Sequence, residues 1–163
     1  MAEKFIANPT MDQIPFESLQ DIYRLWQKAG EEFGYAERKH FTPKMLKEHL
    51  PYLTLIDHEC DSGRFKVRLI GTHYTEAIGF ESTGMYIDEL PNTETMLERY
   101  NWLVREKAPY YAYVDQMRWA DRDYRHYAVL GCPLFDVDKN VNMILFRVTF
   151  ERADDSTAVS PLL

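Results

Sequence analysis

The chain has 163 residues, of which 45% are hydrophobic, and a formal net charge of −7 from 26 acidic and 19 basic side chains. This length fits one domain with a sizeable core, and the acidic balance argues against a general binder of nucleic acids or anionic membranes. No stretch approaches the roughly 18 apolar residues that span a bilayer. Two cysteines without CxxC spacing, and no recognisable signal peptide, predict a cytoplasmic setting.

The first 37 residues form the first predicted unit, an N-terminal arm followed by a flanking helix. Residues 1–14 show no hydrophobic periodicity, which predicts a loose arm. Residues 15–33 are amphipathic at helical spacing, and the partner-contact candidates on their apolar face are Leu19, Tyr23, Trp26 and Phe33. The sequence leaves two interpretations open. The helix folds back on its own sheet, or it contacts a signalling protein or a second copy in a homodimer.

The second predicted unit covers 38–152 and starts with a short helix over 43–49. Residues 52–60 and 64–71 are two strand-like runs on either side of a short Gly-containing turn. This arrangement predicts a β-hairpin. Glycines interrupt residues 72–90, so short helices and loops are expected there. Residues 93–107 predict a second long helix.

Three apolar runs at 110–119, 124–134 and 141–150 are separated by short polar turns, which predicts three antiparallel strands. The last run is apolar at almost every position, which predicts a central strand covered on both faces. The element order therefore predicts an α+β fold with a five-stranded antiparallel sheet and helices mainly on one face. Residues 153–163 are polar and small, and we expect a disordered tail.

Four short phrases resemble those of a small bacterial single-domain PAS family. Residues 53–57 followed by 65–72 resemble its opening hairpin, which ends in an RLxGT phrase, here Arg68-Leu69-Ile70-Gly71-Thr72. Residues 83–90 (TGMYIDEL) resemble its next signature, and Cys132-Pro133-Leu134-Phe135 resembles the end of its fourth strand. The family usually has an acidic-Gly turn next, whereas 136–140 contain no glycine. The resemblance covers about residues 38–150.

The resemblance implies a PAS-like fold with sheet order 2-1-5-4-3, a flanking N-terminal helix, and a sensor or regulatory role through protein contact. It implies no catalytic residue. Aromatic and Met side chains at strand spacing then suggest a filled core or a cavity for a small apolar or planar ligand. The candidate lining residues are Trp102, Tyr111, Tyr113, Met117, Trp119, Tyr127 and Met143. The sequence names no cofactor and assigns no metal ligand, and we expect neither a nucleic-acid nor a membrane partner.

An enzyme is the alternative interpretation. A small α+β-cone enzyme would use a carboxylate in a dry cavity, Asp57 or Asp115, as general base, and a tyrosine hydroxyl as oxyanion donor. Asp57 and Arg68 could instead pair across the hairpin. The element order fits the PAS interpretation better, because two strands precede the long helix and three follow it.

Overall fold

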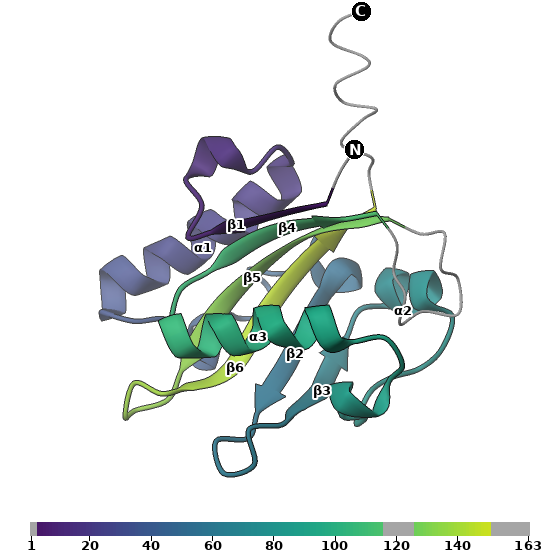
Figure 1. Cartoon of the computed structure of the whole chain (residues 1–163). Helices are drawn as coiled ribbons and strands as arrows, with labels where there is room; N and C mark the ends of the chain where they lie inside the picture. Colours follow the sequence, from purple (N-terminus) through teal and green to yellow (C-terminus); the bar gives the residue numbers. More distant parts are fainter. Residues whose placement is uncertain (1–2, 116–125, 151–163) are drawn as a thin grey trace, which may run out of the picture.

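The computed structural model describes residues 3–115 and 126–150, which fold around one antiparallel sheet (Figure 1). Its strands are β1 (Lys4–Ala7), β2 (Leu53–His58), β3 (Phe65–Ile70), β4 (Tyr110–Val114), β5 (Tyr127–Phe135) and β6 (Val141–Thr149). Its α-helices are α1 (Glu17–Phe33), α2 (Thr72–Ile78) and α3 (Glu94–Glu106). Single 3-10 turns are η1 (Met11–Gln13), η2 (Arg38–His40), η3 (Leu50–Tyr52) and η4 (Ile87–Glu89). The tail predicted over 153–163 lies outside the described residues.

The sheet order is β1-β4-β5-β6-β2-β3. Five of these strands reproduce the order expected from the resemblance, since β3, β2, β6, β5 and β4 are the predicted strands 2, 1, 5, 4 and 3. The sixth strand corrects the prediction of a loose N-terminal arm. Residues 4–7 pair with β4 in the register Lys4↔Tyr113 to Ala7↔Tyr110, because the edge of β4 offers backbone groups that a short segment can pair with.

Strand β6 lies between β5 and β2, and every one of its residues except Asn142 is buried. The prediction of a central strand covered on both faces is confirmed. Two cores follow from this coverage. The inner core lies under α2, α3 and η4, and the outer core lies under α1 and residues 36–46.

The helices cover both faces of the sheet, with α1 on the face opposite α3 (Figure 1). Helices α2 and α3 share one face, as expected, and the N-terminal flanking helix α1 covers the other face. The apolar face of α1 buries Leu19, Ile22 and Tyr23 in the outer core, and Trp26 donates a hydrogen bond from Nε1 to the Pro133 carbonyl oxygen at 2.8 Å. The helix therefore folds back on its own sheet, one of the two open interpretations.

The short helix predicted over 43–49 is wrong. These residues form consecutive turns that lead into η3, although the backbone N–H of Met45 still donates to the Thr42 hydroxyl at 3.2 Å. Seven residues form too short a helix to be stable without extensive packing, and Leu46 and His49 are the only members of the segment that are buried. The segment's packing against the sheet therefore decides its shape.

Gly71 lies where η3 passes the end of β3. A Cβ at Gly71 would lie 2.3 Å from the carbonyl carbon and oxygen of Pro51, which are backbone atoms. We predict that Gly71→Ala lowers the free energy of unfolding by about 1–3 kcal/mol, because backbone must move to relieve the overlap. Urea unfolding followed by circular dichroism measures this loss.

Gly30→Ala is the matched control, since nothing lies within 4 Å of a Cβ at this position inside α1. Alanine there should raise the free energy of unfolding by roughly 0.5–1 kcal/mol. Equal effects of the two substitutions would contradict the close approach of Gly71 to Pro51.

Candidate functional site

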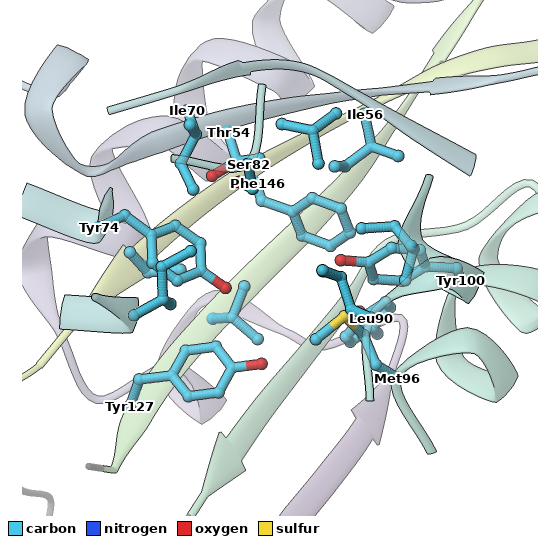
Figure 2. A pocket seen from close by; sticks show the side chains of 16 residues that line it. Thr54, Ile56, Ile70, Tyr74, Ser82, Leu90, Met96, Tyr100, Tyr127 and Phe146 are labelled. Carbon is cyan, nitrogen blue, oxygen red and sulfur yellow. The ribbon is translucent and has the colours of Figure 1, made fainter. Parts of the chain in front are cut away.

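A cavity of about 30 Å³ lies in the inner core, between the sheet and the α2, α3 and η4 segments (Figure 2). The inward residues of β2, β3, β4, β5 and β6 line one side, and residues 74–100 line the other. Its lining residues are Thr54, Ile56, Val67, Ile70, Tyr74, Ile78, Ser82, Ile87, Leu90, Met96, Tyr100, Tyr110, Tyr127, Val129, Phe146 and Val148.

Hydroxyl groups from several elements face this cavity. Figure 2 shows the hydroxyls of Tyr74, Tyr100 and Tyr127 pointing into the same space from different sides. Thr54 and Ser82 add two shorter hydroxyl side chains, 4% and 2% exposed. The Thr54 Oγ1 atom has no hydrogen-bond partner among the described residues. A buried hydroxyl normally has one, so the cavity presents an unused polar contact.

The cavity is electrically neutral, since no acidic or basic side chain contributes to its lining. Burial raises the pKa of Tyr100 well above its ordinary value, and the neighbouring Tyr110 and Tyr127 raise it further. Burial likewise raises the pKa values of Tyr110 and Tyr127. All three phenols are therefore protonated at neutral pH, each able to donate and accept a hydrogen bond.

The size and polarity of the cavity define what it accepts. A volume of about 30 Å³ holds one or two water molecules, so a larger guest has to displace side chains. Met96 of α3 is an unbranched side chain at this wall and can change rotamer. An apolar body with one hydroxyl or carbonyl group would satisfy both the aliphatic lining and the Thr54 hydroxyl.

The candidate pocket residues predicted from sequence fall in different places. Tyr127 lines the cavity. Trp102 lies partly buried at the margin of the inner core, with its ring centroid 6.4 Å from that of Tyr110. Tyr111 and Tyr113 point to the opposite face and belong to the outer core, as does Met143. Met117 and Trp119 lie outside the described residues.

The pairing of β4 with β5 explains this division. Tyr127 pairs with Val114, and directly opposed residues share a face of the sheet. Counting back from Val114 by twos leads to Tyr110, not to Tyr111 or Tyr113. A single strand shows alternation but not register, so the sequence did not reveal which tyrosines share a face with Tyr127.

Sequence analysis also missed Thr54, Tyr74, Ser82 and Tyr100 as lining residues. Tyr100 lies in the helix predicted over 93–107, and only the packing of α3 on the sheet brings it to the cavity. Tyr74 and Ser82 lie in the interrupted stretch where no regular pattern was visible. Thr54 lies between Leu53 and Leu55 in β2, so its side chain points to the opposite face of the sheet from theirs. This alternation is the one sequence signal that could have indicated that Thr54 faces the cavity.

The four predicted partner-contact residues are mostly buried. Leu19 and Tyr23 are buried at 0% and 2% exposure, and Trp26 is partly buried. Phe33 differs, since it is 51% exposed and stacks on His40 with ring centroids 3.9 Å apart. Of the four residues, only Phe33 at the C-terminal end of α1 is exposed.

Neither carboxylate of the enzyme interpretation lines the cavity. Asp57 pairs with Arg68 across the hairpin, with Nε 3.0 Å from both carboxylate oxygens, as the sequence suggested. Asp115 is exposed. Within the described ranges 3–115 and 126–150, no group of three or more His, Cys, Asp and Glu side chains could hold a metal ion. Burial raises the pKa of Cys132, which keeps it an unreactive thiol.

Residues 82–90 cover the cavity. Backbone hydrogen bonds join Val67 of β3 to Gly84 and Met85, and two side-chain contacts also fasten the segment to the β2–β3 hairpin. The Tyr86 hydroxyl donates to Glu59 Oε2 at 2.6 Å. The Arg64 guanidinium donates twice to Asp88, at 2.7 and 2.8 Å, and its Cζ lies 3.6 Å from the centroid of the Tyr86 ring. The hydrogen bonds from Tyr86 and Ser62 hold the pKa of Glu59 below its usual value. We call these two contacts the hairpin latch.

Comparison with known proteins identifies the family of this chain. A sequence profile described as PAS domain matches residues 14–134. The chain therefore belongs to the PAS domain family, whose members are typically sensor and signalling modules. A search of curated proteins finds no match. No helix among the described residues has the length and apolar character needed to cross a membrane.

The chain is also similar to solved structures at low sequence identity. An RNA-binding light-oxygen-voltage receptor matches with a TM-score of 0.52 and 9% identity, over 91% of this chain and 39% of that chain. The PAS domain of histidine kinase ThkA matches with a TM-score of 0.45 and 13% identity, over 60% and 98%. A sensory box histidine kinase/response regulator from Burkholderia thailandensis E264 matches with a TM-score of 0.46 and 16% identity, over 72% and 92%.

The buried phenols predict how stability depends on alkaline pH. Tyr100 and Tyr127 have raised pKa values in the folded chain, while the unfolded chain ionises near the ordinary value of 10.0. Below that pH these phenols are protonated in both states, so their contribution to stability does not change with pH. Above it the unfolded state loses protons first, so the free energy of unfolding falls as pH rises.

Ultraviolet titration of tyrosinate, with circular dichroism on the same samples, measures this effect. We expect some of the eleven tyrosines to titrate only as the chain unfolds, and Tyr127→Phe to reduce the alkaline loss of stability. Ionisation of every tyrosine in a chain that stays folded would contradict the burial of these phenols.

The hairpin latch predicts that Arg64→Ala loosens the cover of the cavity. Without the guanidinium, Asp88 and the Tyr86 ring lose their shared contact, so amide hydrogen exchange over residues 82–90 should accelerate severalfold. Urea unfolding should change little, because the pair is exposed. Arg24→Ala is the control, since it breaks the exposed Asp21 pair on α1. Unchanged exchange over 82–90 would count against the latch.

Proposed function

We propose that this chain is a regulatory PAS module that acts by contact with a separate signalling protein and responds to a small neutral molecule in the inner cavity. The observation that carries the proposal is the ring of hydroxyls around an apolar cavity, with the buried Thr54 Oγ1 unpaired among the described residues. Such a cavity favours a ligand that combines one hydrogen-bonding group with an apolar body.

The neutral lining restricts the class of guest. A carboxylate or phosphate guest would be buried without a cationic partner among the lining residues, which is costly. An apolar or planar molecule with a hydroxyl or carbonyl group fits better. Because the cavity holds only about 30 Å³, such a guest would shift side chains of α3 such as Met96. That shift supplies the two states that a signal requires.

The cavity favours a sensor over the enzyme interpretation. A general base needs a carboxylate, imidazole or amine beside the reacting atom, and the lining offers only hydroxyls, hydrocarbon and the thioether of Met96. Asp57 and Asp115 lie elsewhere, one paired with Arg68 and the other exposed. We therefore propose that the chain binds without turning over its ligand.

The cellular setting is part of the same proposal. Cys60 and Cys132 are both free thiols, which is the usual state of cysteines in a reducing compartment. We propose a cytoplasmic module whose partner is a protein. Contact through α1 would involve its C-terminal end, where Phe33 is exposed, rather than the buried Leu19 and Tyr23.

Phenol is a suitable probe, because it combines a small apolar ring with one hydroxyl. Titration into the ¹⁵N-labelled full chain should shift amide signals around Thr54 and Tyr127, whereas benzoate should not. Thr54→Val, which keeps the shape but removes the hydroxyl, should weaken phenol binding about fivefold, the loss of one hydrogen bond. Thr72→Val is the control, since Thr72 is exposed at the start of α2.

The outcomes separate clearly. Inner-face shifts with phenol that Thr54→Val weakens and Thr72→Val leaves unchanged support the proposal. No inner-face shifts with phenol, or equal shifts with benzoate, would overturn it. Native mass spectrometry of the purified chain adds a second readout, since a retained neutral small molecule appears there as a mass adduct.

A further inference from the structure

A second apolar pocket lies on the outer face of the sheet, where residues 38–50 cross β2 and β3. Seven of its nine lining residues are leucines, and we call it the leucine pocket. Leu53 and Leu55 of β2 form part of its floor. Leu50 and Leu69, which are 38% and 40% exposed, extend the apolar surface to the solvent.

The exposure of these leucines is unusual for this chain. Within the described residues, six large hydrophobic side chains are exposed. Leu50 and Leu69 line the leucine pocket, and Met45, at 42% exposure, belongs to the same crossing segment. A volume of about 30 Å³ accepts the end of one apolar side chain. Exposed apolar side chains gathered around such a pocket mark a contact surface.

The segment that forms the rim is basic, although the whole chain is acidic. Arg38, Lys39, Lys44 and Lys47 are exposed on residues 38–50, against a single exposed acidic residue there, Glu48. Neither Lys44 nor Lys47 forms an ion pair with another described residue, whereas Lys39 lies 3.7 Å from Glu37. The net charge of −7 is therefore reversed locally beside the leucine pocket.

We infer that the leucine pocket binds an acidic amphipathic segment of a partner protein. An apolar side chain of that segment enters between Leu50 and Leu69, and its Asp or Glu residues meet Lys44 and Lys47. The inference rests on the proposed function, in which the chain acts by protein contact. The rim charge decides which partner is attracted, and the leucines hold it.

The same observations argue against the other occupants. A two-fold contact between copies would place the same basic rim on both sides, so Lys44 and Lys47 would face like charges. Nucleic acid needs a broad positive field, and the chain as a whole is negative. An acidic protein segment satisfies both the apolar pocket and the local charge.

Strand β2 connects this surface to the inner cavity. Leu53 and Leu55 point to the leucine pocket, while Thr54 and Ile56 point to the cavity. The two sites therefore lie back to back on one strand. A guest that displaces Thr54 or Ile56 acts on the same backbone that positions the pocket floor.

Fluorescence anisotropy with two labelled probe peptides tests the inference on the full chain. Both peptides are short and helical, with Leu at i, i+3, i+4 and i+7; one carries Glu and the other Lys at the remaining positions. The overall charge of the chain favours the Lys peptide, whereas the leucine pocket favours the Glu peptide. We expect saturable binding of the Glu peptide that weakens with salt.

Variants locate the binding surface. Leu69→Asp should weaken the Glu peptide at least about tenfold, because it places a carboxylate in the apolar contact. The double variant Lys44→Glu, Lys47→Glu should weaken it to a similar extent while leaving the packed leucines intact, which covers the case in which Leu69→Asp fails to fold. Val137→Asp is the control, since Val137 is apolar and 76% exposed outside this surface.

Failure of the Glu peptide to bind would overturn the inference. Equal or tighter binding of the Lys peptide, or losses with Val137→Asp as large as those with Leu69→Asp, would do the same. Self-association in sedimentation that the Lys44→Glu, Lys47→Glu variant abolishes would also overturn it in favour of a second copy. Phenol titration of Leu69→Asp separates the two proposals, since intact phenol binding leaves the cavity proposal standing when peptide binding fails.

Discussion

The structure depends on the alternation of side chains along three central strands that are covered on both faces. Strand β6 is buried at eight of nine positions, and β2 and β5 flank it. Successive residues of these strands must therefore fill two separate cores, each with its own shape. One strand cannot shift by a single residue without exchanging the contents of both cores.

Aromatic rings fill most of the inner core, which explains why its cavity is small. Phe65 contacts Tyr100, Tyr100 contacts Phe146, and Phe146 contacts Tyr110, with ring centroids 5.3, 4.9 and 6.2 Å apart. Gly131 leaves room for this row, since a Cβ there would lie 2.6 Å from Phe146 Cε1. The many aromatics of the chain thus close the core almost completely and leave hydroxyls at the remaining gap.

Much of the fold could be predicted from the sequence, because local patterns carry it. The hairpin of 52–60 and 64–71, the long helices and the central last strand follow from periodicity and turn residues. The pairing of residues 4–7 with β4 could not be predicted, since four residues carry no period. The turns over 43–49 were not predicted for a different reason. Packing on the sheet decides the shape of this segment and overrides its helical start.

The candidate site was harder to predict than the fold. Tyr127 lines the cavity in the structure, but only the register between β4 and β5 shows that Tyr110, and not Tyr111, shares its face. Thr54 and Tyr100 reach the cavity from elements far apart in the chain. The local charge reversal around Lys44 and Lys47 was visible in the sequence, yet only the fold places it beside exposed leucines.

Strand β1 determines which strand lies at one edge of the sheet. It covers the free edge of β4, whose sequence YYAYV is rich in aromatic and β-branched residues and has no charge. Such a segment, once its edge is open, is a template for stacking with identical strands of other molecules. Residues 4–7 thereby protect this edge against such stacking. Phe5 holds β1 in place, with its ring centroid 5.4 Å from that of Trp102.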